Sequence, residues 1–210
     1  MSSMVDISQQ LQMGKAKVVK EMVQAALSEG IDPKTILDEG LLSGMAIIGK
    51  KFKNNEVFVP EVLVAARAMN MGIEVLKPYL AQAGVKEIAT AVIGTVKGDL
   101  HDIGKNLVKM MLESKGFKVV DLGVDVSAER FIVAAIENQA ELVCCSALLT
   151  TTMDQMKSIV EEAETRGVRD KIKIMIGGAP VTQAFCDAIG ADCYMPDAAS
   201  AADAAAKLVS

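Results

Sequence analysis

The segment at residues 94–106, GTVKGDLHDIGKN, contains the only histidine of the chain, His101, and separates two unlike halves. An apolar run at residues 88–96 leads into it, and an amphipathic run at residues 103–112 leads out of it. This order predicts a strand, a loop and a helix, with His101 in the loop. In an open parallel sheet, such a loop faces the crevice in which ligands bind.

Strand and helix patterns alternate through residues 86–210. The apolar runs that predict strands lie at residues 88–96, 117–122, 142–145, 172–176 and 193–195. The amphipathic runs that predict helices lie at residues 103–115, 128–139, 153–166, 181–189 and 198–209. Strands that alternate with helices form parallel sheets covered on both faces. We therefore predict an α/β domain with a flavodoxin-like (Rossmann-like) five-stranded parallel sheet.

Residues 1–85 show helical periodicity without a convincing strand. The helices are predicted at residues 5–13, 14–27, 33–52 and 60–80, where apolar side chains recur with the helical period. Asp32 and Pro33 have the residue types preferred at a helix N-cap and first turn. These helices predict an N-terminal antiparallel helical bundle, which a linker at residues 78–86 joins to the sheet domain.

Composition narrows the possible partners. The chain has 210 residues, of which 51% are hydrophobic, and a formal net charge of -5. Because no run of basic residues is present, we expect no nucleic-acid partner. The longest uncharged run, residues 174–186, is too short to span a bilayer, so we expect no membrane partner.

The cysteines indicate a reducing compartment. Because they lack the paired CxxC spacing of a zinc or redox site, we expect small, buried thiols in a cytoplasmic protein. They are Cys144, Cys145, Cys186 and Cys193.

Asp99 and His101 have the residue types and spacing of a metal-binding imidazole with a supporting carboxylate. A histidine that binds a metal through one ring nitrogen commonly donates its other N–H to a carboxylate. The chain has no second histidine, so the remaining ligands of such a metal would come from a cofactor. A phosphate-binding loop is excluded, because Asp99 and Asn106 stand where it needs glycine and a hydroxyl residue. A histidine that merely caps the following helix stays open as the alternative.

Three motifs occur in order along the sheet domain. Asp99, His101 and Gly104 form the pattern DxHxxG, Ser146-Ala147-Leu148 follows, and Gly177-Gly178 comes last. This trio resembles the cobalamin-binding domains that hold the cofactor with its own base displaced. The helical half, with VPE at residues 59–61 and AARAM at residues 65–69, is similar to the cap domain of corrinoid methyl carriers. These are the corrinoid proteins of methylamine, methanol, betaine and methoxyaromatic methyltransferase systems and the matching module of cobalamin-dependent methionine synthase.

The resemblance implies a role for each motif residue. The cofactor would be cobalamin or a related corrinoid, bound base-off with His101 as the lower axial ligand of cobalt. Asp99 would bond to the far ring nitrogen, and Thr152, where the family usually carries serine, would complete the relay. The other residues implied to contact the corrin or its nucleotide tail are Gly98, Asp102, Ile103, Gly104, Ser146, Leu148, Thr150, Gly177, Gly178, Tyr194, Pro196 and Asp197.

The helical domain at residues 1–85 would cover the methyl-bearing face of the corrin and swing aside at the linker. Met69, with Met45 and Met71, would line that cover, and ordinary core packing is the alternative for these methionines.

The implied function is a methyl carrier that is not a complete enzyme on its own. A substrate-specific methyltransferase would methylate the corrinoid, and a second methyltransferase would pass the methyl group to tetrahydrofolate or to a thiol such as coenzyme M. A reductive activase would be a third partner. The alternatives are the small subunit of an adenosylcobalamin mutase and a cobalamin-binding sensor module. The sequence leaves open which methyl donor is used.

Overall fold

The chain divides into two compact units, Met1–Lys86 and Glu87–Ser210. Helices form the described part of the first unit. The computed structural model describes residues 4–83 and 87–210. The helices of the first unit are α1 (Met4–Gln12), α2 (Ala16–Ser28), α3 (Pro33–Thr35), η1 (Ile36–Leu42), α4 (Ser43–Lys53) and α5 (Val59–Gln82). Helix α2 packs along α5 and buries Val19 and Val23, as the apolar stripe predicts. Asp32 caps α3 by accepting a hydrogen bond from the Thr35 N–H at 3.0 Å.

Two features of this unit differ from the prediction. The helix predicted at residues 33–52 contains a π-helical segment, η1, in which the Ser43 N–H donates to the Asp38 carbonyl. The prediction that the linker begins at Pro78 was wrong, because Pro78 lies inside α5. Proline removes only one N–H from the helix, and the next turn continues through the hydrogen bond from Ala83 N to Tyr79 O. Residues 84–86 of the predicted linker lie outside the described residues.

The second unit is a parallel sheet with the strand order β2-β1-β3-β4-β5. Its strands are β1 (Thr90–Thr95), β2 (Lys118–Asp121), β3 (Leu142–Ser146), β4 (Lys173–Gly177) and β5 (Cys193–Tyr194). Its helices are α6 (Ile103–Glu113), α7 (Ala128–Glu137), η2 (Thr150–Thr152), α8 (Asp154–Thr165), η3 (Arg169–Lys171), α9 (Gln183–Ile189) and α10 (Ala198–Leu208). The predicted flavodoxin-like sheet is therefore confirmed.

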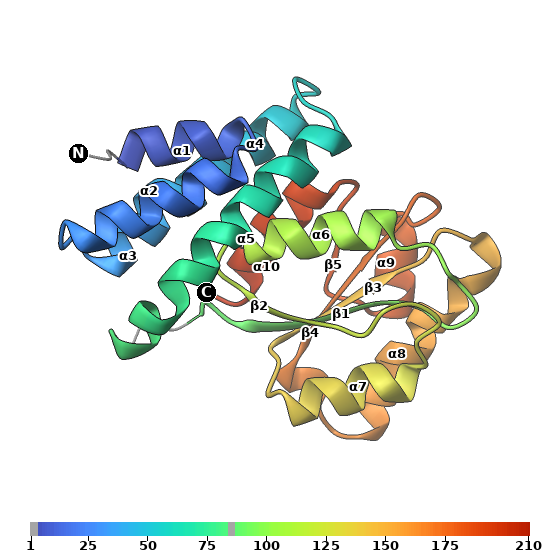
Figure 1. Cartoon of the computed structure of the whole chain (residues 1–210). Coiled ribbons are helices and arrows are strands. Elements are labelled where there is room, and N and C mark those ends of the chain that lie inside the picture. The colour runs from blue at the N-terminus through green and yellow to red at the C-terminus, as the bar shows by residue number, and fades with distance from the viewer. Residues whose placement is uncertain (1–3, 84–86) are drawn as a thin grey trace. The chain divides into compact units, whose positions relative to one another are not determined.

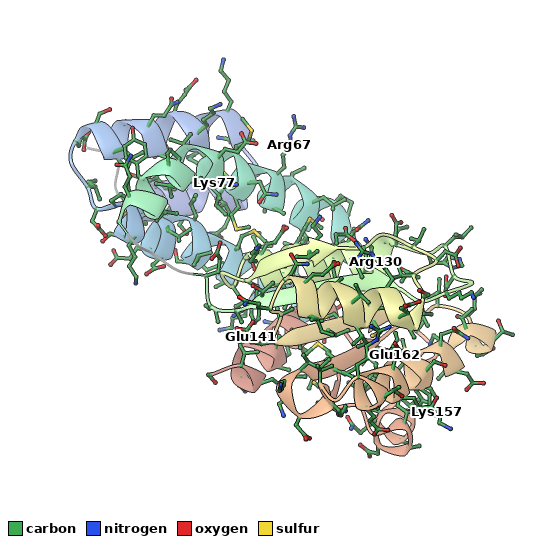
Figure 2. The ribbon with its side chains drawn as sticks, turned by 90° about the horizontal axis from the view of Figure 1, so that it is seen from below. Arg67, Lys77, Arg130, Glu141, Lys157 and Glu162 are labelled. Carbon is green, nitrogen blue, oxygen red and sulfur yellow. The ribbon has the colours of Figure 1, made fainter. Side chains whose placement is uncertain are left out.

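Helices cover both faces of this sheet. Figure 1 shows α7 and α8 on one face and α6 with α10 on the other. A hydrophobic core cluster on the α7 and α8 side includes Phe131 and Ile159 of these helices together with Val143 and Ile174 of the sheet. Burial on both faces explains why the central strands read as unbroken apolar runs. Charged side chains such as Arg130, Lys157 and Glu162 lie on the outer surfaces of these helices (Figure 2).

The order of the strands places a crevice beside β1 and β3. After β1 the chain continues to β2 on one side of the sheet, and after β3 it continues to β4 on the other side. The order in which strands are added therefore reverses between β1 and β3. Ligands of open α/β sheets bind outside the carboxyl ends of the strands at such a point. The loop with His101 follows β1, and the loop with Leu148 follows β3.

At the opposite end of the sheet, Glu141 accepts a hydrogen bond from the Thr90 N–H at 2.8 Å (Figure 2). Among the described residues, no helix has the length and apolarity to cross a bilayer.

Candidate functional site

The side chain of Asp99 connects the loop after β1 to the loop after β3. Its Oδ1 accepts hydrogen bonds from His101 Nδ1 at 2.6 Å and from the His101 N–H at 3.0 Å. Its Oδ2 accepts from the N–H groups of Leu148 at 2.7 Å and Leu149 at 3.2 Å, and Thr152 Oγ1 lies at 3.2 Å. Both predicted partners of Asp99, His101 and Thr152, are therefore in contact with it.

Burial and hydrogen bonding act in opposite directions on the Asp99 carboxyl group, which is 0% exposed. Burial alone would raise its pKa, because it removes water from the charged form. The hydrogen bonds from His101, Leu148 and Leu149 outweigh burial, and the net effect lowers the pKa below its ordinary value of 3.8. Asp99 is therefore an anion at neutral pH, and it holds the proton of the imidazole on Nδ1.

This lowered pKa predicts acid sensitivity. A carboxyl group whose pKa is lower in the folded state stabilises the fold above its unfolded pKa and loses that contribution as the pH falls through the folded value. The wild-type protein should therefore lose stability more steeply than Asp99→Asn below about pH 4, by on the order of 2 kcal/mol, the range for hydrogen bonds to a charged group. Urea unfolding at a series of pH values measures this difference. Parallel pH profiles for the two proteins would contradict it.

His101 presents its other ring nitrogen away from this hydrogen-bonded anchor. Its side chain is 53% exposed, and with Nδ1 bonded to Asp99 the atom left to bind a metal is Nε2. The ring does not cap α6, because the N-cap residue of that helix is Asp102. Among the described residues, no group of three His, Cys, Asp or Glu side chains could hold a metal ion. The arrangement can therefore supply one imidazole ligand to a metal whose other ligands come from elsewhere.

Exposed apolar side chains lie in and next to the two loops that Asp99 connects, at the carboxyl end of the sheet. Leu100 and Ile103 are each 72% exposed, and Leu148 and Leu149 after β3 are also exposed. Water-facing apolar groups gathered on functional loops commonly mark a binding surface. Such a surface suits a large, largely apolar ligand rather than a small polar one.

The two glycines at the end of β4, Gly177 and Gly178, have different structural roles. A Cβ at Gly178 would lie 1.8 Å from the Ala147 carbonyl oxygen, and the φ of Gly178 is +137°. This residue therefore has to be glycine for the loops after β3 and β4 to lie together. A Cβ at Gly177 would be 3.8 Å from the Met195 carbonyl oxygen, which is ordinary contact. Gly178 thus has a structural reason within the chain itself, whereas Gly177 does not.

Gly104, in contrast to Gly178, has no such reason. It lies in the first turn of α6, its φ is not positive, and a Cβ there would meet no atom within 4 Å. Glycine is less favourable than alanine inside a helix, so neither helix stability nor packing within the described chain explains the glycine at this position. This open space lies three residues after His101, on the exposed side of the first turn of α6.

Comparison with known proteins assigns the family. Residues 89–206 and residues 6–77 each match a family profile described as a B12 binding domain. Trimethylamine corrinoid protein 1 of Methanosarcina acetivorans is 45% identical over 180 residues, which cover 85% of this chain and 83% of that protein. The chain belongs to the corrinoid protein family. A second corrinoid protein, the dimethylamine corrinoid protein of Methanosarcina barkeri, is 43% identical over 93% of this chain and 92% of its own.

Solved structures agree with this assignment to the corrinoid proteins. The methanol:cobalamin methyltransferase complex MtaBC from Methanosarcina barkeri contains a chain with a TM-score of 0.87 and 34% identity. That match covers 97% of this chain and 78% of the other. A cobalamin-binding protein from Desulfitobacterium hafniense DCB-2 has a TM-score of 0.81 and 29% identity, and 99% of each chain is covered. The predicted family and fold are therefore confirmed.

The other residues predicted to contact the corrin or its nucleotide tail lie at the ends of strands β3 and β5 and in the segments that follow them. Ser146 ends β3 and pairs in register with Thr95 and Gly177, while Thr150 is exposed at the start of η2. Tyr194 ends β5, and Pro196 follows it. Asp197 caps α10, because its Oδ1 accepts a hydrogen bond from the Ser200 N–H at 2.8 Å.

The methionines predicted for the cap lie in the helical unit of this corrinoid protein. Met45 and Met69 are fully buried, whereas Met71 is partly exposed. Their contact with a corrin stays a prediction.

Two residues at the candidate site were not predicted from the sequence. Thr95, at the end of β1, is fully buried, and its hydroxyl donates to the His101 carbonyl at 2.8 Å. Asp125, in the loop after β2, accepts a hydrogen bond from the Gly98 N–H at 2.7 Å. A threonine in an apolar strand gives no distinct signal. An aspartate after Gly123 indicates a turn but not its partner.

Proposed function

We propose that the protein binds cobalamin or a related corrinoid base-off and carries a methyl group on its cobalt between two methyltransferases. The observation that carries this proposal is the Asp99–His101 pair. Its 2.6 Å contact occupies Nδ1 and leaves Nε2 as the ring nitrogen available to bind a metal. The pair follows β1 at the carboxyl edge of the sheet, the usual ligand side of this fold. The names of the relatives, which include trimethylamine and dimethylamine corrinoid proteins, support the same function.

The residues present fit a corrinoid. One imidazole with a buried anionic partner suits a metal that is otherwise held by a macrocycle, since the chain has no other histidine. The exposed leucines and Ile103 give that macrocycle an apolar rim, and Gly104 leaves space at the start of α6. These features support a lower-face site on the sheet domain.

The chain's own groups would control the axial bond. When bound, the corrinoid supplies a cobalt that can accept and release a methyl group. Asp99 keeps the proton on Nδ1, so that Nε2 retains a lone pair that would bind the metal. The single hydroxyl proton of Thr152 has two nearby acceptors, Asp99 Oδ2 at 3.2 Å and the Leu149 carbonyl at 2.9 Å. We propose that rotation of this O–H between the two acceptors adds or removes one hydrogen bond to Asp99. This would change how strongly the carboxylate accepts from Nδ1–H, and hence how strongly His101 would bind the metal.

The partners in this proposal are other proteins. One methyltransferase specific for the methyl donor would load the methyl group, a second would remove it, and a reductive activase would restore the cofactor. We further propose that residues 1–85 form the cap over the methyl-bearing face and that residues 86–210 bind the corrinoid.

A cytoplasmic location fits the four free cysteines, which are all buried. Burial raises the pKa of the Cys144 thiol to about 12, so that thiol is unreactive at neutral pH.

Gly104→Ala separates cofactor binding from folding. In the protein without cofactor, we expect the free energy of unfolding to rise by up to about 0.5–1 kcal/mol, because alanine favours a helix over glycine. In contrast, we expect the corrinoid Kd to increase by at least about 10-fold, because the methyl group overfills the open space at the start of α6. Urea unfolding and a spectroscopic binding titration measure the two effects. Unchanged affinity would show that the corrin does not approach Gly104.

Reconstitution tests the proposed function. The purified chain is loaded with hydroxocobalamin, reduced anaerobically and treated with methyl iodide, and its absorbance is followed. We expect the pigment to stay with the protein through gel filtration and the spectrum to convert to a methyl–cobalt form. We also expect demethylation when an authentic thiol- or folate-dependent methyltransferase is added. Protein that emerges colourless from gel filtration would contradict the proposal.

A further inference from the structure

Asp125 holds the backbone from which Asp99 and His101 project. Its Oδ1 accepts a hydrogen bond from the Gly98 N–H at 2.7 Å. Its own N–H donates to the Asp99 carbonyl oxygen at 3.0 Å. Through these two bonds, Asp125 in the loop after β2 holds the N–H of Gly98 and the carbonyl of Asp99 in the loop after β1.

The backbone of Asp125 adopts a conformation that most side chains avoid. Its φ is +55°, in the left-handed region, which glycine occupies freely and which aspartate and asparagine tolerate better than other residues. Glycine would therefore satisfy the backbone here, but it would leave the Gly98 N–H without its carboxylate acceptor. The use of aspartate at a left-handed position indicates that the acceptor matters.

The neighbouring backbone directs this contact toward the site. Val126 pairs with Val96 in a parallel bridge, and the Val126 N–H donates to the Thr95 carbonyl at 3.0 Å. Asp125 thus lies directly before the bridge that joins the two loops. Gly98 itself has a φ of +82°, and the chain turns there before Asp99.

We propose that Asp125 is a positioning residue, which fixes the direction of the Asp99–His101 pair by holding Gly98 and Asp99. Asp125 touches neither imidazole nor metal, and it acts through Asp99, whose carboxylate joins His101 to the loop after β3. The loops after β1, β2 and β3 therefore meet at Asp99, and Asp125 is the contribution of the β2 side. The consequence for cobalt rests on the proposed function, whereas the consequence for the imidazole does not.

The first experiment uses the protein without cofactor. Because the chain has one histidine, nitrogen-15 NMR of the ring reports on His101 alone. Three variants are compared with the wild type: Asp125→Asn keeps an oxygen acceptor and tolerates the left-handed backbone, Asp125→Gly keeps the backbone but removes the acceptor, and Asp125→Ala loses both. The comparison of the glycine and alanine variants separates the hydrogen bond from backbone strain.

We expect the acceptor to decide the result. In Asp125→Gly, exchange of the Gly98 amide proton should accelerate by about 10- to 100-fold, the range for loss of a hydrogen bond to a charged group. The Nδ1–H signal of His101 should broaden or disappear in the same variant. Asp125→Asn should retain both signals, with Gly98 exchange within about 10-fold of the wild type. A glycine variant with wild-type exchange and a wild-type Nδ1–H signal would overturn the proposal, as would an asparagine variant as impaired as the glycine variant.

The second experiment uses protein loaded with cobalamin and reduced to the cobalt(II) state. Electron paramagnetic resonance measures the fraction of cobalt bound by a histidine nitrogen. We expect that fraction to fall in Asp125→Gly and to be preserved in Asp125→Asn; equal fractions in the two variants would overturn the role in axial ligation. If the wild type itself takes up no cobalamin, the proposed function fails, and the NMR comparison alone decides the role of Asp125.

Discussion

Replacing His101 with alanine should weaken corrinoid retention more than any other single change in the sheet domain that leaves the fold intact. The variant loses the nitrogen that would bind cobalt, and it leaves the Asp99 carboxylate without its imidazole partner. Loss of a hydrogen-bonding partner behind a metal ligand typically costs about 10- to 100-fold, so loss of the ligand should exceed that range. Equilibrium titration with cobalamin and absorbance spectroscopy of the bound form measure the effect.

Asp99→Asn is the matched control for this change. It keeps the imidazole and a side chain of similar size, so its loss of affinity should stay within about 10- to 100-fold. The ring of His101 is 53% exposed, so removing it should change the free energy of unfolding far less than it changes binding. An alanine variant with wild-type affinity and an unchanged methyl–cobalt spectrum would contradict direct ligation.

Gly178→Ala should be the most destabilising single-methyl change at the site. The added Cβ would lie 1.8 Å from the Ala147 carbonyl oxygen, and the φ of +137° is one that side chains rarely adopt. An unfavourable backbone conformation alone costs about 1–3 kcal/mol, and separating two packed loops adds to it. We expect the free energy of unfolding to fall by at least about 3 kcal/mol in urea titrations.

Two glycines of the same unit separate the causes of this effect. Gly190 has a φ of +74° and nothing within 4 Å of an added Cβ, so Gly190→Ala measures the backbone cost, about 1 kcal/mol. Gly177→Ala measures an added methyl group at ordinary contact distance, without a left-handed backbone. If Gly178→Ala were no worse than Gly190→Ala, the close approach of the two loops would not exist in solution.

The fold was predictable because its signals are local and periodic. Apolar runs such as residues 142–145 gave strand β3 to within one residue, and the alternation with helices gave the sheet order. The π-helical segment at Ile36–Leu42 was not predictable, since a short π-helical insertion shifts the apolar pattern of the surrounding helix too little to stand out in a single sequence. Pro78 was misread for a related reason, because a proline signals a break that packing around Leu76, which is fully buried, can override.

The site was predictable where one short motif holds its chemistry. Asp99 and His101 are two residues apart, and their contact follows from that spacing. Asp125 lies far along the chain from Gly98, and only the parallel ladder of β1 and β2 brings them together. Gly178 was assigned to a cofactor by resemblance, whereas its nearest neighbour is the backbone of Ala147. Contacts between distant backbone segments leave no pattern in a single sequence.

Electron paramagnetic resonance of the cobalt(II) form, prepared once with ordinary histidine and once with nitrogen-15 histidine, tests the central claim most directly. Because His101 is the only histidine, the label reports on a single residue. We predict that each cobalt line is split into a triplet in the unlabelled protein and into a doublet in the labelled protein. Splitting that does not respond to the label, or no nitrogen splitting at all, would contradict ligation of cobalt by His101.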